Sequence, residues 1–212
     1  MLGCTLFSVI IATVIIATAY FSGPRLTGFV NANLRLSDIA SATGVNYTAI
    51  KINNVSSFAG SLSGEGYRAL SISEFVLNTT NHTISYPTIV TSALYSLSND
   101  TAANQTEQSV LFVANQMQSS ISGRFYGNTS VFNYSYSGET ARMYNIFSIA
   151  VINASNAVLP YVAAYPVYQY SVAFQYKSYV AFITLNGYSN LSSYYSETLA
   201  KALFRNMIDS RI

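Results

Sequence analysis

The hydrophobic and polar positions of this chain change their spacing several times, and the first segment is apolar throughout. Residues 1–21 contain no Asp, Glu, Lys, Arg or His, and the first charged residue is Arg25. A helix rises about 1.5 Å per residue, so roughly 20 apolar residues match the ~30 Å hydrocarbon core of a bilayer. The sequence therefore predicts an apolar helix over residues 1–22 that enters a membrane.

Two interpretations of this helix remain open. The small residues Ala17 and Ala19 match the cleavage site of a secretory signal peptide. The length of the apolar run, and the lack of a basic segment before it, favour a retained membrane anchor instead. In both cases residues 1–21 contact a membrane and the rest of the chain is exported across it.

Residues 23–45 are expected to form a stalk that contains a strand. Gly23-Pro24 breaks the helix, and strict alternation follows at 30–36. This alternation places four apolar side chains on one face: Val30, Ala32, Leu34 and Leu36. It places Asn31, Asn33 and Arg35 on the other. The strand at 29–36 either pairs within its own domain or is donated to a neighbouring subunit. Ser37 and Asp38 then cap a short helical turn that ends at Gly44.

Residues 46–212 alternate between strand-like and helix-like periods. Alternation or short apolar runs predict strands at 47–58, 66–77, 84–97, 124–135, 142–152, 168–176 and 179–185, with Lys177-Ser178 as a tight turn. Pro87 suggests an edge or a bulge in the third of these. Apolar residues at helical spacing predict amphipathic helices at 104–122 and 193–209, the second with Leu199, Ala202, Leu203 and Met207 or Ile208 on its apolar side.

These elements suggest one α+β domain over residues 46–212. The order strand, strand, helix occurs at 67–121 and again at 166–209. We therefore predict an N-terminal apolar, transmembrane-type helix followed by an antiparallel sheet carrying two amphipathic helices. An all-β sandwich is the alternative.

The chain has few charged residues, but its composition is not that of a disordered protein. Charged residues make up 8% of the chain, against about 25% in an ordinary domain. Eighteen Tyr residues, with Ser, Thr and Asn, supply the polar surface, and half of all residues are hydrophobic. The net charge of +2 comes from scattered Lys and Arg. This excludes the basic patch that nucleic-acid binding requires.

The sequence offers no recognisable catalytic or metal-binding motif. Cys4 is the single cysteine and lies in the apolar run, and His82 is the single histidine. Nucleophilic catalysis of the Ser-His-Asp type could centre only on His82. The carboxylates are dispersed: Asp38, Glu65, Glu74, Asp100, Glu107, Glu139, Glu197 and Asp209. We therefore expect a protein that is not an enzyme and binds no cofactor or metal.

Acceptor sequences for N-glycosylation are the strongest compositional signal. Ten Asn residues begin an Asn-x-Ser/Thr triplet without Pro: Asn46, Asn54, Asn78, Asn81, Asn99, Asn104, Asn128, Asn133, Asn153 and Asn190. They are spread over the whole of the predicted exported part. This distribution predicts N-linked glycans and an extracytoplasmic location at the cell surface.

In composition the chain resembles exported surface proteins of thermoacidophilic archaea, which include subunits of glycosylated pili and threads. The resemblance rests on the apolar first segment and the Tyr-, Ser- and Asn-rich, charge-poor, sequon-dense body. It covers the whole chain but includes no motif, so it implies no functional residue. Archaeal type IV pilins are also similar in having an apolar helix and a β-rich head, but their charged leader peptide is not seen here.

Three functional hypotheses follow. The first is a non-catalytic structural subunit of a glycosylated archaeal surface filament, which would associate with copies of itself. The second is a singly anchored accessory or ligand-binding subunit of a membrane complex. The third is an exported hydrolase, which would need carboxylates clustered around a cleft.

Overall fold

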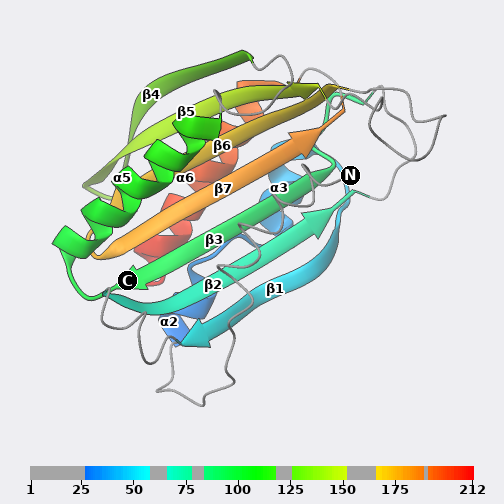
Figure 1. Ribbon diagram of the computed structural model, residues 1–212. Helices are drawn as coiled ribbons and strands as arrows, with labels where there is room; N and C mark the ends of the chain where they lie inside the picture. The colour runs from blue at the N-terminus through cyan, green and yellow to red at the C-terminus, as the bar shows by residue number, and fades with distance from the viewer. Residues whose placement is uncertain (1–26, 58–65, 78–83, 118–125, 152–165, 189–190) are drawn as a thin grey trace.

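The computed structural model describes residues 27–57, 66–77, 84–117, 126–151, 166–188 and 191–212 of the chain (Figure 1). Within these ranges the chain forms one antiparallel sheet with helices on both faces. The predicted apolar helix at 1–22 lies outside the described residues. No helix among the described residues combines the length and apolar character needed to cross a membrane.

The sheet has seven strands in the order β1-β2-β3-β7-β6-β5-β4. The strands are β1 (Thr48–Ser57), β2 (Tyr67–Val76), β3 (Ile89–Leu97), β4 (Tyr126–Tyr136), β5 (Glu139–Val151), β6 (Pro166–Tyr176) and β7 (Tyr179–Gly187). Every pairing is antiparallel, and β3 pairs with β7 at the centre. The sheet therefore joins an N-terminal meander of three strands to a C-terminal meander of four.

Helices cover the two faces of the sheet unequally. Helix α5 (Asp100–Met117) lies on one face, against β3, β7 and β6 (Figure 1). Helix α6 (Ser193–Asp209) lies on the opposite face across β4, β5, β6 and β7, beside α3 (Leu36–Thr43) and α2 (Thr27–Asn31). Each face of the central strands is thus buried, which is why these strands are apolar on both sides.

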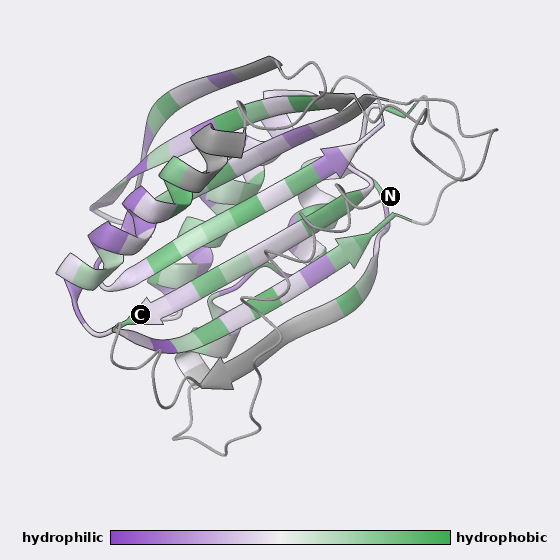
Figure 2. Ribbon diagram, viewed as in Figure 1, coloured by the Kyte–Doolittle hydropathy of each residue, from purple (hydrophilic) through white to green (hydrophobic). Residues whose placement is uncertain are grey.

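Strand β7 shows how one sequence serves two cores. Ala181, Ile183 and Leu185 are buried in the large cluster that contains α6. Val180 is buried in a separate cluster beneath α5, and Phe182 packs against another there. The almost continuous apolar run predicted as a strand at 179–185 is therefore required by the helices on both faces (Figure 2).

The predicted fold class is wrong. The prediction was an apolar helix followed by a sheet with two amphipathic helices. The molecule is instead dominated by a single seven-stranded sheet, and four helices are described. The alternative of a sandwich fails as well, because every described strand belongs to the same sheet. Most individual elements are nonetheless confirmed, including both halves of the repeat: β2-β3-α5 and β6-β7-α6.

The strand predicted at 29–36 is also wrong. Residues 27–31 form α2, and α3 begins at Leu36. Ala32 and Leu34 are buried in the domain's own core, while Leu36 is 38% exposed. The side chain of Val30 lies outside the described part. This segment therefore packs against the domain instead of forming a stalk with a strand for intersubunit pairing.

Local hydrogen bonds explain why helical turns replace that strand. The Arg35 backbone N–H donates to Asp38 Oδ2 at 2.8 Å, and Arg35 Nη2 donates to the Asn31 carbonyl at 2.9 Å. The Asp38 contact completes a capping box at the start of α3, and Gly44 ends that helix with a φ of 71°. Such side-chain bonds satisfy backbone groups that a strand would offer to a neighbour.

Candidate functional site

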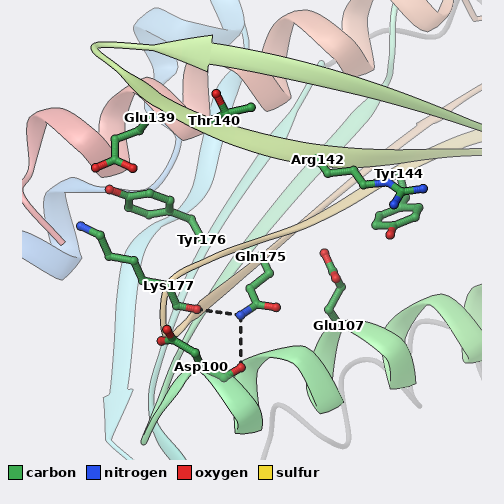
Figure 3. Close-up of a pocket in the computed structure, with 9 residues that line it drawn as sticks. All are labelled: Asp100, Glu107, Glu139, Thr140, Arg142, Tyr144, Gln175, Tyr176 and Lys177. Carbon is green, nitrogen blue, oxygen red and sulfur yellow. Dashed lines mark hydrogen bonds between the residues drawn. The ribbon is translucent and has the colours of Figure 1, made fainter.

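A charged cleft lies where α5 leaves the sheet uncovered. It has a volume of about 430 Å³ and is lined by Asp100, Glu107, Glu139, Thr140, Arg142, Tyr144, Gln175, Tyr176 and Lys177. These residues come from α5, β5, the end of β6 and the β6–β7 turn (Figure 3). Three of the eight acidic residues of the whole chain and two of its ten basic residues meet here.

Glu107 is the most buried charged group of the cleft. It occupies the sheet-facing side of α5, one turn after the fully buried Ala103, and is 7% exposed. Its carboxylate points toward Arg142, which β5 presents on the same face as Tyr144 (Figure 3). The guanidinium carbon of Arg142 lies 5.3 Å from the centre of the Tyr144 ring. Glu107 is therefore held by its helix against a cation on the sheet.

The β6–β7 turn closes the other end of the charged cleft. Lys177 adopts a left-handed conformation with a φ of 50°, which matches a two-residue hairpin turn. Its ammonium lies 4.5 Å from the centre of the Tyr176 ring. Gln175 Nε2 donates to the carbonyl oxygens of Lys177, at 2.9 Å, and of Asp100, at 3.2 Å (Figure 3). These bonds tie the turn to the first residue of α5.

The folded structure raises the pKa of two groups in the cleft, Glu107 and Lys177, for different reasons. Desolvation raises the pKa of the Glu107 carboxyl, while a backbone hydrogen bond from Gln175 and the charge of Arg142 oppose this to a smaller extent. The pKa of Lys177 is also raised, first by a side-chain hydrogen bond with Tyr176 and further by the negative charge of Glu139. The cleft thus combines an exposed ammonium with a carboxyl that resists ionisation.

Replacing Glu107 by Gln is expected to stabilise the protein at neutral pH. The folded state raises the pKa of Glu107, so it binds this proton more tightly than the unfolded chain does. The resulting stabilisation is complete below pH 4.5 and is lost as the pH rises through the folded pKa. We expect Glu107→Gln to raise the free energy of unfolding at pH 7 and to leave it nearly unchanged below pH 4.5.

Denaturant unfolding of the wild type and the variant from pH 3 to pH 8 measures this effect. The difference between them should grow from pH 4.5 upward. Gln108→Asn, a neutral substitution at an exposed position of the same helix, is the control and should change stability by the same amount at every pH. A Glu107→Gln difference that is constant with pH contradicts the assignment.

The carboxylates named from the sequence are only partly brought together. Asp100, Glu107 and Glu139 line the charged cleft, whereas Asp38, Glu74, Glu197 and Asp209 do not. Glu65 and His82 lie outside the described residues. Within the described ranges, no three His, Cys, Asp or Glu side chains are arranged to hold a metal ion. Sequence reasoning missed Arg142, Gln175 and Lys177, since nothing in the local pattern distinguishes them from solvated strand and turn residues.

The sequon asparagines form the second group of candidate site residues. All five whose side chains are described are exposed: Asn46, Asn99, Asn104, Asn128 and Asn133. Among the asparagines outside sequons whose side chains are described, Asn33 and Asn145 are buried, Asn186 and Asn206 are half-buried, and Asn31 is exposed. The side chains of the remaining sequon residues, Asn54, Asn78, Asn81, Asn153 and Asn190, lie outside the described part of the chain.

Comparisons with known proteins give no family. No protein-family model matches the chain, and no curated protein matches it either. Among solved structures, the chain is similar to the extracellular domain of PknH from Mycobacterium tuberculosis. The two share 12% sequence identity and a TM-score of 0.49, over 82% of this chain and 92% of that one.

Proposed function

We propose that this chain is a non-catalytic structural subunit of a glycosylated cell-surface assembly, of the kind represented by archaeal pili and threads. One observation carries the proposal: every sequon asparagine with a described side chain is exposed, whereas four of the five other asparagines with described side chains are buried or half-buried. A transferase needs the amide nitrogen of the acceptor to be accessible, and these five side chains satisfy that requirement.

The five described sequon asparagines are also spread over several elements of the domain. Asn46 precedes β1, and Asn128 and Asn133 lie on β4. Asn99 immediately precedes α5, and Asn104 lies in its first half. Glycans at these positions would hydrate a surface that has few charges of its own. The apolar sequence at residues 1–21 supplies the membrane contact through which such a subunit would be exported and held at the cell surface.

A ligand-binding accessory subunit is the second candidate, and the charged cleft favours it. In a chain with 8% charged residues, the meeting of five of them around about 430 Å³ would suit a small polar molecule that carries charge. The cleft supports a hydrolase less well. A carboxyl pair needs a substrate between its members, whereas Glu107 faces a cation and is almost wholly buried.

Negative-stain microscopy of protein purified from its native cells separates the two candidates. A structural subunit is expected to appear as filaments or threads that disassemble into monomers under mild denaturation. Immunogold labelling of intact cells with antibody to residues 191–212 identifies the labelled object as this chain. Isolated membrane particles of constant stoichiometry, without filaments, would contradict the proposal and favour the accessory subunit.

A further inference from the structure

A second cavity, here called the aromatic hollow, lies at the beginning of α6. It has a volume of about 210 Å³ and is lined by Asn128, Ser130, Asn145, Phe147, Tyr170 and Ser193. These residues belong to β4, β5, β6 and the first position of α6. Cavities for drug-sized ligands measure about 300–1,000 Å³, so this hollow fits a single ring-sized group.

The hollow has an aromatic wall and a polar wall. The Phe147 ring lies 4.7 Å from that of Tyr170 and 6.4 Å from that of Tyr168, measured between centroids. All three side chains are half-buried, so part of this aromatic surface faces solvent. The polar wall includes Asn145, which is 2% exposed and whose Oδ1 accepts a hydrogen bond from Ser196 Oγ at 3.1 Å. Sugar rings bind to such combinations through their C–H faces and their hydroxyl groups.

A sequon asparagine lies at the rim of this hollow. Asn128 is exposed, lines the cavity, and is the direct cross-strand partner of Phe147. Side chains at directly opposed positions of an antiparallel pair have Cβ atoms about 4.5–5.5 Å apart. A sugar joined to the Asn128 amide nitrogen therefore starts next to the Phe147 ring, within reach of Ser130 and Ser193.

We propose that the aromatic hollow is the intramolecular binding site for the first sugar of an N-linked glycan on Asn128. The attached ring packs on Phe147 and Tyr170, and its hydroxyl groups bond to the polar wall. The proposal rests on the glycosylation that the proposed function requires. Because the covalent bond holds the sugar beside its site, even weak contacts are populated.

The same strand provides a matched control site. Asn133 is also an exposed sequon asparagine on β4, but five residues later it lies on the opposite face of the sheet. Its cross-strand partner is Arg142 instead of an aromatic residue. A glycan on Asn133 should therefore gain nothing from Phe147.

Full-length protein expressed in its native organism tests the proposal. Occupancy is measured by glycopeptide mass spectrometry, and thermal unfolding is recorded for the wild type, Asn128→Gln, Phe147→Leu and the double variant. Asn128→Gln is expected to lower Tm by about 2–4 °C in the wild-type background and by much less in the Phe147→Leu background. Asn133→Gln should change Tm equally in both backgrounds.

A second measurement uses the unmutated protein, so that it does not depend on how the variants fold. An enzyme that cleaves the bond between asparagine and the first sugar should release the Asn128 glycan from the folded protein several-fold more slowly than the Asn133 glycan. After denaturation the two rates should be equal. Equal rates in the folded state, or an Asn128→Gln effect that is unchanged by Phe147→Leu, overturn the proposal.

Occupancy separates this proposal from the proposed function. If Asn128 is bare while other sequons carry glycans, the inference about the aromatic hollow is wrong and the surface-glycoprotein function stands. If every sequon is bare, both fail.

Discussion

Replacing Asn33 by Ala is expected to cost about 3 kcal/mol or more of stability, because each buried polar group left without a partner costs about 1–3 kcal/mol. Asn33 is fully buried between the first helices and the sheet. Its Nδ2 donates to the Ser71 carbonyl at 3.0 Å and the Ser71 hydroxyl at 3.1 Å, and its Oδ1 accepts from Ser92 Oγ at 2.6 Å and the Leu34 N–H at 2.8 Å. The variant leaves all of these groups in an apolar surrounding.

Urea unfolding of the two proteins measures the loss. Asn31→Ala is the matched control: Asn31 is exposed, and its hydrogen bond with Arg35 uses the backbone carbonyl, which the substitution keeps. It should change stability by less than about 0.5 kcal/mol. An Asn33→Ala variant as stable as the control would show that this segment is not anchored to β2 and β3 through Asn33.

Replacing Phe204 by Ala is expected to destabilise the domain by about 3–5 kcal/mol, a large part of the ~5–15 kcal/mol that a domain of this kind possesses. The Phe204 ring is fully buried in α6 and meets three rings of the sheet edge-on. Ring centroids lie 5.3 Å away for Tyr176, 6.0 Å for Phe174 and 6.1 Å for Tyr134. Truncation removes all three contacts and opens a cavity between α6 and β4–β6.

Calorimetry should show the Phe204→Ala transition lowered by roughly 6–20 °C, from about 2–4 °C for each kcal/mol in a domain of this size. Phe112→Ala on α5 removes an identical side chain that is 63% exposed. This control should leave Tm within a few degrees of the wild type. If both variants shift Tm equally, the packing of α6 on the sheet is not the main core of the domain.

The elements with a strict period were predictable from sequence. Helix α6 spans Ser193–Asp209 as expected, with Leu199, Ala202, Leu203 and Met207 buried. The β6–β7 hairpin turns at Lys177-Ser178, as predicted from the two alternating runs on either side. In both cases one whole face of the element is buried against the rest of the domain, so the spacing of hydrophobic residues indicates the element directly.

Predictions failed where tertiary contacts override the local pattern. Asn33 occupies a polar position of the alternating segment 29–36, yet it is buried. Its side chain forms hydrogen bonds with Ser71 and Ser92, which lie far away in sequence. Pro87 suggested an edge or a bulge, but β3 starts after it and lies between β2 and β7. A single sequence does not reveal which strands become neighbours, and that order decides both cases.

The two cavities were beyond sequence reasoning for the same cause. Glu107 points toward Arg142 only because α5 packs on β6, the neighbour of β5, and Asn128 faces Phe147 only through the register of β4 with β5. The sequons themselves were identifiable as triplets. Their shared exposure, and the aromatic partner of one of them, depend on strand pairing that the triplets do not encode.

Glycopeptide mass spectrometry of the protein purified from its own cells tests the central claim most directly. Each tryptic or chymotryptic peptide that contains a sequon is assigned as bare or modified. Glycans are expected on the exposed residues Asn46, Asn99, Asn104, Asn128 and Asn133. Unmodified peptides at all ten sequons of the chain would contradict a glycosylated surface protein.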